Sequence, residues 1–257
     1  MIRRDMQLDD GSQAWALISQ VEHARVAAEL ATDWGSAAVE SYPRADVVLP
    51  TVLHHDDGWA EWEAQPTIDP ATGKPRAFTE MPNDVAHAIW RRSIERVGPW
   101  GPLAQFMVAR HFMRLRLAGD EPEEESVRAF LSEFGPRCDR WREEFIAAAR
   151  LAHDTDVPEL AVGFFQIFDL FSLYLCCTPS RREYQFPLPN GGALTLTIAA
   201  GEVTVHPWPW EVSEKSICAV AAQIPATPLA SDAELRDRIS AAGIELGWQL
   251  KPLQSEN

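Results

Sequence analysis

The sequence predicts a mainly α protein in which a helical bundle carries a small antiparallel β region. Apolar residues at helical spacing occupy much of residues 19–178, whereas β-branched and alternating residues dominate after Pro179. A pair of short alternating runs also precedes residue 19. We therefore expect one domain over residues 1–257. It would have a helical core at 19–178 and a β-containing appendage, formed by 1–18 and 179–257, packed on that core.

The N-terminal residues predict two short strands followed by a helix. The strands are expected at residues 1–4 and 15–18, joined by the turn-forming residues 9–12. From Gln20 to Trp34 the apolar residues return at helical spacing, and Gly35 is a suitable stop.

Four further helices follow a short helix and a long loop. Pro50 suits the first turn of the short helix, which Gly58 would end. Residues 65–82 contain four prolines and a glycine, which predict a loop, and loops of this length often line a site. The further helices are expected at 84–97, 103–118, 124–152 and 158–177, the third with a break allowed near Gly135-Pro136. The acidic residues 120–125 are interpreted as a solvated helix start.

The C-terminal part predicts strands and one short helix. Strands are expected at residues 184–186, 194–198, 203–205 and 216–223, separated by glycine-containing turns. Ser231 to Glu234 has the form of a capping box, which predicts a helix reaching about Ala242.

Composition and charge restrict the class of partner. The formal charge of −15 disfavours nucleic acids and anionic membranes, because both require a basic surface. No apolar run approaches the roughly 20 residues that cross a bilayer, so we expect a cytoplasmic protein. The four cysteines lack CxxC spacing and are expected to be buried free thiols. A small-molecule substrate, which can be anionic, is the expected partner, and a homodimer is left open.

Histidines and aspartates form the most informative pattern. The segment HHDDGW, residues 54–59, places an adjacent His-Asp pair at the end of the short helix. His23, His87 and His111 each lie in a different expected helix, and Asp169 interrupts a strongly apolar one. A lone buried carboxylate costs several kcal/mol, so Asp169 requires solvent or a partner. Each residue singly is also compatible with an ordinary structural role.

Their order resembles that of the HD-domain superfamily of metal-dependent enzymes. In that superfamily a His, a His-Asp pair and a late Asp hold a metal within a helical bundle, matched here by His23, His55-Asp56 and Asp169. The resemblance implies that His87 and His111 complete a dinuclear site. It implies two divalent metal ions, with iron or manganese favoured over zinc. Trp59 stands where many members carry Lys or His, a departure from the usual phosphohydrolase pattern.

Other residues are candidates for catalysis or substrate binding. His54 and Asp57 could carry protons, although both also suit a polar helix end. The substrate-binding candidates are Arg114 for an anion, Gln166 beside Asp169, Lys74 in the long loop and Trp59 as a pocket wall. For each of them a surface or core role is the alternative.

Three functions are open at this point. The first is an HD-type hydrolase in which a metal-bound hydroxide attacks a small phosphorylated molecule. The second is a di-iron oxygenase of the inositol-oxygenase-like type. The third is a non-catalytic sensor or interaction module with a structural or vestigial metal site, in which exposed tryptophans of His206-Pro207-Trp208-Pro209-Trp210 would form the binding surface. The whole chain also resembles a bacterial family known as domain of unknown function 3891, through Met1 to Arg4, HHDDGW and residues 166–173.

Overall fold

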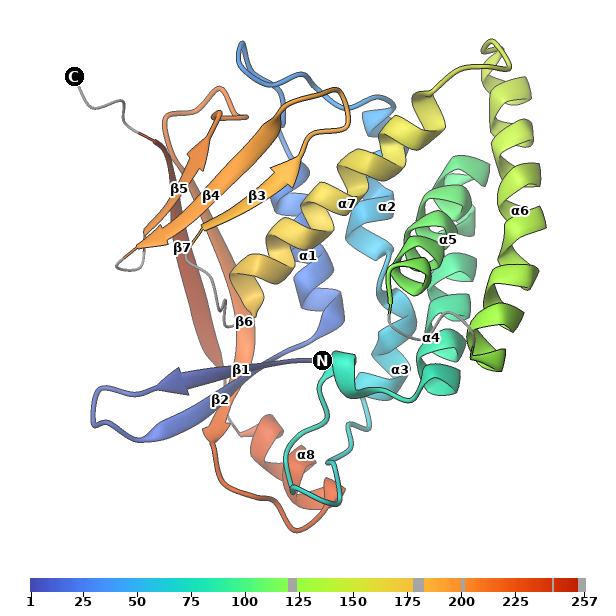
Figure 1. Cartoon of the computed structure of the whole chain (residues 1–257). Coiled ribbons are helices and arrows are strands. Elements are labelled where there is room, and N and C mark those ends of the chain that lie inside the picture. Colours follow the sequence, from blue (N-terminus) through green and yellow to red (C-terminus); the bar gives the residue numbers. More distant parts are fainter. Residues whose placement is uncertain (120–123, 178–182, 200–201, 242, 254–257) are drawn as a thin grey trace.

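The computed structural model describes residues 1–119, 124–177, 183–199, 202–241 and 243–253. Within these residues a seven-stranded sheet has the order β1-β2-β6-β7-β5-β4-β3 (Figure 1). The strands are Ile2–Gln7 (β1), Gln13–Ile18 (β2), Glu183–Pro187 (β3), Ala193–Ala199 (β4), Glu202–His206 (β5), Lys215–Pro225 (β6) and Ile244–Pro252 (β7). Strands β5 and β7 are parallel, and the other neighbours are antiparallel.

Strand β6 joins the two parts of the sheet. Residues 215–221 of β6 pair with β7, and residues 222–225 pair with β2. Its alternating Ile217, Ala219 and Ala221 are buried, and the strand packs against the first helix, as the period of two in a strand requires. The N-terminal hairpin therefore belongs to the same sheet as the C-terminal strands.

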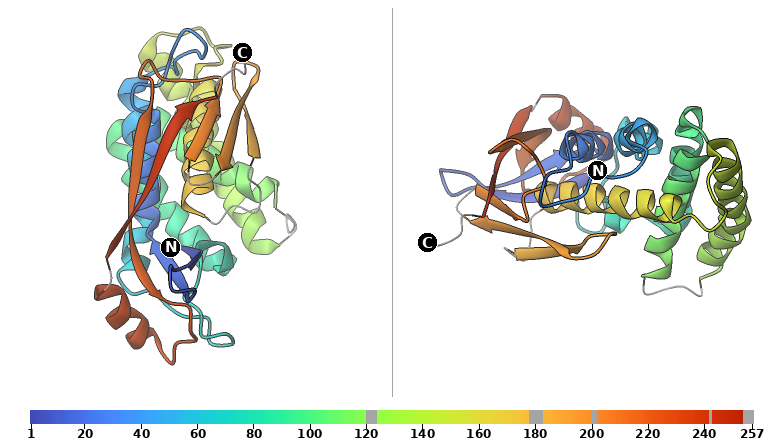
Figure 2. Two further views of the ribbon diagram at one scale, coloured as in Figure 1. Left: turned by 90° about the vertical axis from the view of Figure 1, so that its left-hand side faces the viewer. Right: turned by 90° about the horizontal axis from the view of Figure 1, so that it is seen from above.

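Most of the helices gather on one side of this sheet. The helices are Gln20–Ala31 (α1), Ala45–His54 (α2), Ala60–Glu63 (α3), Asn83–Arg96 (α4), Pro102–Leu117 (α5), Glu125–Ala149 (α6), Val157–Cys176 (α7) and Asp232–Ser240 (α8). Helices α1 and α7 lie next to the sheet, while α4, α5 and α6 lie farther away, with α6 outermost (Figures 1 and 2). Phe171 of α7 stacks on Phe186 of β3, so helices and sheet share one large core.

The small helix α8 covers the other face of the N-terminal hairpin. Trp15 and Leu17 of β2 pack there with Leu235 of α8 in a second cluster. Ala16 and Ile18, on the opposite face of the same strand, belong to the main core. Strand β2 is therefore buried on both faces, which explains its almost continuous apolar sequence.

The expected fold class, a mainly α HD-domain-like bundle with a small antiparallel β region, was wrong. The sheet is a full layer of seven strands and includes a parallel pair. No strand was expected at β7, where Gly247 and Pro252 weaken the local β pattern. Pairing with β6 on one side and β5 on the other stabilises that strand, and such distant pairing leaves no local trace in the sequence.

Most expected helices are confirmed, although α1 ends at Ala31 rather than Trp34, α6 ends at Ala149 rather than Ala152, and the two helices with internal prolines also differ from expectation. Helices α4, α5 and α7 lie within one residue of the expected bounds at each end. Helix α2 begins five residues before Pro50, which lies inside it rather than in its first turn. Helix α6 continues through Pro136, because Phe134 and Cys138 on either side of the proline are buried in the core. The acidic residues 120–123, Pro179 and Ala242 lie outside the described residues.

Helix α7 is similar in length and composition to a membrane-spanning helix. Among the described residues it alone has the length and apolar composition of a membrane span, but 67% of its apolar window is buried inside the protein. This burial is consistent with a soluble protein. All four cysteines are described and are free thiols, with Cys138 and Cys176 buried and Cys177 and Cys218 half-buried.

Candidate metal centre

The His-Asp pair lies at the end of α2, where the last carbonyl groups of a helix lack intrahelical partners. The Nδ1 atom of His55 lies 2.7 Å from the carbonyl oxygen of Val52. A carbonyl oxygen only accepts, so Nδ1 carries the hydrogen and donates it. This bond leaves the lone pair of a neutral His55 on Nε2, which is buried without a hydrogen-bond partner among the described residues.

Gly58 allows the turn after the His-Asp pair to lie directly against α4. A Cβ atom at this position would lie 2.3 Å from the carbonyl oxygen of Ile89 and 2.6 Å from the nitrogen and Oγ of Ser93. The Gly58 N–H instead donates to Ser93 Oγ at 3.2 Å. The close approach of two backbones therefore requires glycine two residues after Asp56.

His23 is fixed by α7. Helix α1 begins after Ser19, whose Oγ accepts a hydrogen bond from the Glu22 N–H, so His23 lies in its first turns. Ser172 Oγ lies 2.8 Å from the carbonyl oxygen of Asp169 and 2.6 Å from Nδ1 of His23. The hydroxyl donates to the carbonyl and accepts from Nδ1–H, which leaves the lone pair of a neutral His23 on Nε2.

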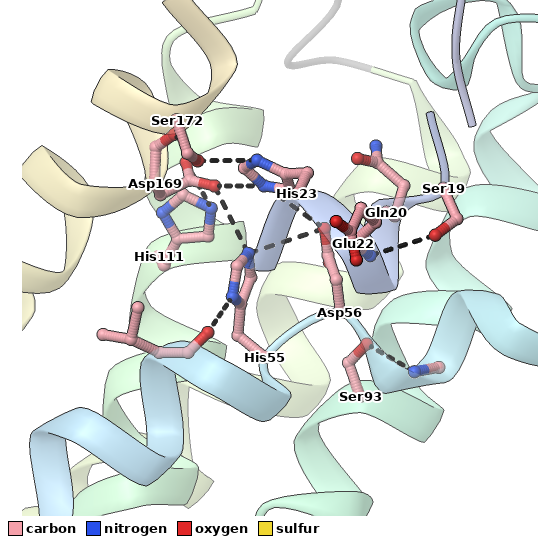
Figure 3. Close-up of polar contacts among 12 residues, drawn as sticks. Ser19, Gln20, Glu22, His23, His55, Asp56, Ser93, His111, Asp169 and Ser172 are labelled. Carbon is pink, nitrogen blue, oxygen red and sulfur yellow. Dashed lines mark hydrogen bonds and ion pairs between the residues drawn. The ribbon is translucent and has the colours of Figure 1, made fainter. Parts of the chain in front are cut away.

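These side chains converge in one buried cluster (Figure 3). Asp169 Oδ1 lies 3.0 Å from Nε2 of His23 and 3.3 Å from Nε2 of His55. Asp56 Oδ2 lies 3.5 Å from Nε2 of His55 and 3.8 Å from Nε2 of His23. Donor atoms of His23, His55 and Asp56 all lie within 4.8 Å of one another. Each of these four residues is at most 5% exposed.

The cluster is electron-rich, and the pKa values reflect this. Burial lowers the pKa of His55, but the carboxylates of Asp56 and Asp169 outweigh it and raise the pKa to about 9. Burial raises the pKa of Asp56, and the nearby imidazoles only partly offset this. Burial also acts to raise the pKa of Asp169, yet the imidazoles of His111, His23 and His55 hold it well below its usual range. The site thus attracts positive charge, whether a proton or a metal ion.

His111 and His87, the remaining expected ligands, are placed differently. His111 Nε2 lies 3.6 Å from Asp169 Oδ2, so Asp169 faces His23 and His55 with one oxygen and His111 with the other. His87 instead stacks on Phe130, with ring centroids 4.8 Å apart, and its Nε2 is buried without a partner in the described part of the chain. Five of the six expected ligands therefore converge, while His87 faces α6.

The cluster forms the floor of a cleft of about 240 Å³. Aromatic side chains dominate its walls, among them Trp59, Phe78, Trp90 and Phe112. The described lining residues also include Gln20, Asn83, Arg116 and Leu173. This cleft is smaller than the roughly 300 Å³ at which sites for drug-sized ligands begin. It therefore suits a small molecule with an apolar or flat body.

Several expected site residues lie elsewhere. His54 and Asp57 form an ion pair at 2.9 Å, with His54 stacked on Trp100, and the described residues that line the cleft do not include them. Arg114 contacts Glu159 and Gln166, and these three line a separate groove beside β3. Lys74 is exposed on the long loop. Trp59, only 2% exposed, does line the cleft, as expected.

Sequence reasoning missed Arg116 and the residues that hold it. Arg116 is five residues after His111 and is not on the same helical face. Arg114, three residues after His111, shares more of that face and was the expected residue. Its Nη1 donates to Asn83 Oδ1 at 2.7 Å, and the guanidinium lies 4.4 Å from the centre of the Trp90 ring. Asn83 and Trp90 are seven residues apart on α4, a spacing that places both on one face. That spacing is the sequence feature that could have identified Asn83 and Trp90 as neighbours in the cleft.

Comparison with known protein families gives a match over most of the chain. Residues 1–225 match the family described as protein of unknown function DUF3891. The chain belongs to the DUF3891 family. The matched part includes all five converging residues, the cleft and strands β1 to β6, whereas α8 and β7 follow it. No curated protein and no solved structure matches the chain. The family is described as having unknown function, so the match does not identify an activity. The HD-domain resemblance remains a hypothesis.

Proposed function

We propose that this DUF3891 protein is an HD-type metal-dependent enzyme that hydrolyses a small phosphorylated molecule. The proposed metal ligands are His23, His55, Asp56 and Asp169. The observation that supports this is two imidazole lone pairs, fixed by hydrogen bonds at Nδ1, that face two carboxylates in a buried cluster. Without a cation or protons between them, these groups would repel one another at a cost of several kcal/mol.

The spacing of the donor atoms of His23, His55 and Asp56, which all lie within 4.8 Å of one another, fits a metal ion. Asp169, the fourth proposed ligand, lies 3.0 Å from His23 and 3.3 Å from His55. Two donors about 2.1 Å from a shared ion lie roughly 3.0 to 4.2 Å apart in octahedral geometry. The four nitrogen–oxygen distances of the cluster run from 3.0 to 3.8 Å. Nitrogen and oxygen donors without sulfur suit iron, manganese or zinc, and the HD-domain resemblance favours the first two.

A cation here would stabilise charge on a phosphoryl group and lower the pKa of a bound water. The chain itself contributes position and exclusion of solvent. His55 is oriented by Val52 and His23 by Ser172, so neither ring has to reorganise on binding. Burial lowers the pKa of His111 to about 4, which keeps this histidine neutral beside Asp169. Aromatic residues line the cleft, and the proposed ligands on its floor are at most 5% exposed.

The proposal is for one ion at this cluster. The expected second ion depended on His87, which faces Phe130 rather than the cleft. A second ion would have Asp169 Oδ2 and His111 as its protein donors. The di-iron oxygenase alternative needs that second ion. The interaction-module alternative required exposed tryptophans within residues 206–210. Trp210 is only 1% exposed and packs against Trp34 in the core.

Metal analysis of protein from cells supplied with iron and manganese tests the proposal. We expect about one ion per chain for this His₂Asp₂ donor set, and loss of that ion in His55→Ala and Asp169→Ala. His54→Ala is the matched control, because His54 is the neighbour of His55 but contacts Asp57 and Trp100. Wild-type protein that is folded by circular dichroism and metal-free after this treatment would overturn the proposal.

Activity assays distinguish phosphate hydrolysis from oxygenation once metal is bound. Hydrolysis of p-nitrophenyl phosphate that is lost in Asp169→Ala would support the phosphohydrolase. Two irons per chain with substrate-dependent oxygen consumption, and no phosphatase activity, would favour the oxygenase instead.

A further inference from the structure

The cleft has a second layer of polar side chains above its metal-binding floor. Gln20 precedes His23 by three residues on α1, and Arg116 follows His111 by five residues on α5. At 1.5 Å per residue these offsets are about 4.5 and 7.5 Å along the helix axes. Helices α1 and α7 run in opposite directions, and Leu173, four residues after Asp169, lines the cleft with Gln20 and Arg116 (Figure 1).

Arg116 is held in place before any ligand arrives. Its guanidinium donates to Asn83 and lies over Trp90 at 4.4 Å from the ring centre. These contacts order a long side chain whose loss of rotamer entropy would otherwise oppose ligand binding. Among the described residues that line the cleft, Arg116 is the only lysine or arginine. An ordered guanidinium is suited to planar two-oxygen groups such as carboxylate and phosphate.

Gln20 indicates a ligand at the same level independently. The residue is 2% exposed, and its Oε1 is buried without a hydrogen-bond partner in the described structure. A buried amide oxygen without a donor carries a cost in free energy. Because Gln20 lines the cleft, a ligand that brings a hydrogen-bond donor would remove this cost.

The charges of the floor and of the second layer differ. Two carboxylates and a divalent cation with neutral histidines would leave the floor with no net charge. Arg116, a positively charged residue of the second layer, follows His111 by five residues, an offset of about 7.5 Å along the helix axis. An anion bound there would be separate from the group that meets the metal.

We propose that the substrate is a small two-ended anion, with its reacting group at the metal ligands and a separate carboxylate or phosphate bound by Arg116. This inference rests on the proposed metal-dependent function. The cleft of about 240 Å³ limits the substrate to a compact molecule, and the aromatic walls contact its apolar body.

Two non-hydrolysable probes test the inference by calorimetry on manganese-loaded protein. Phosphonobutyrate carries a carboxylate at the end opposite its phosphonate, and propylphosphonate is the same chain without it. The wild type should bind phosphonobutyrate at least about tenfold more tightly, which is the effect of one charge-assisted hydrogen bond. Arg116→Gln should reduce this preference to about twofold or less and leave propylphosphonate binding unchanged. Arg116→Lys, which keeps the charge, should retain part of the preference.

Arg114→Gln is the matched control, because Arg114 lies on the same helix but lines the separate groove. It should retain the full preference, and manganese content should be equal in all four proteins. Equal loss of both probes in Arg116→Gln would overturn the inference, since Arg116 would then bind the group at the metal. Manganese binding without any preference in the wild type would overturn this inference only. Absence of manganese binding in the wild type would overturn the metal centre as well.

Discussion

Gly58→Ala tests whether the turn that carries the His-Asp pair needs its close contact with α4. The new Cβ would lie 2.3 Å from the carbonyl oxygen of Ile89 and 2.6 Å from the backbone nitrogen of Ser93. Both are helix backbone atoms and cannot rotate away. Overpacking costs about 1–3 kcal/mol, and loss of the hydrogen bond to Ser93 costs about 1 kcal/mol more. We expect the free energy of unfolding to fall by about 2–4 kcal/mol.

Urea unfolding of the metal-free protein, followed by tryptophan fluorescence, measures this change. Asp56 lies two residues from Gly58, so manganese affinity should fall by at least about tenfold as its carboxylate moves. Gly135→Ala is the control, because a Cβ there meets nothing within 4 Å, and its stability should stay within about 1 kcal/mol of wild type. An unchanged unfolding midpoint and manganese affinity in Gly58→Ala would refute the reasoning.

Three other substitutions test single contacts. Ser172→Ala removes the group that accepts from His23 Nδ1, and manganese affinity by calorimetry should fall about 10- to 100-fold without loss of the fold; unchanged affinity would contradict the orienting role. Gln20→Leu removes a buried unpaired amide oxygen, so the ligand-free protein should gain about 1 kcal/mol in urea unfolding, and a loss of stability would contradict the absence of a partner. Burial lowers the pKa of His87 from 6.5 to about 4. Between these pH values the unfolded chain takes up a proton that the folded chain does not, so stability falls as the pH falls. His87→Phe should remove up to about 3 kcal/mol of that loss in urea titrations at neutral and acid pH, with metal content unchanged. A lower metal content would instead identify His87 as a ligand.

Local periodicity predicted several helices closely, and the order of the histidines and aspartates pointed to the residues of the buried cluster. The apolar spacing of three and four placed α4, α5 and α7 within one residue at each end. His23, the His-Asp pair, His111 and Asp169, which the order of residue types singled out, lie close together in the structure. Such a pattern can be recognised because the ligand types and their order are visible without the fold.

The errors came from the packing partners of single side chains and from distant pairing. On α4, Asn83 and Trp90 line the cleft, whereas His87, which lies on the same side of the helix, stacks on Phe130 of α6. On α5 the reach of a long side chain brought Arg116 to the cleft, while Glu159 holds Arg114 beside a separate groove. Neither side-chain position can be predicted without knowing where the partner helices lie. The parallel pairing of β5 with β7 likewise has no local signal.

The position of β7 has a consequence for how the protein is made. This strand follows the other six in the chain, yet it lies between β6 and β5 in the sheet. During synthesis the hairpin of β1 and β2, the helices and the hairpins of β3, β4 and β5 can emerge and begin to fold first. Strands β1, β2 and β6 stay separate from strands β5, β4 and β3, with the neighbouring edges of β6 and β5 unpaired, until residues 244–252 leave the ribosome. Folding is therefore completed after most of the chain has been translated, and a nascent chain stalled before residue 244 would expose both edges to aggregation.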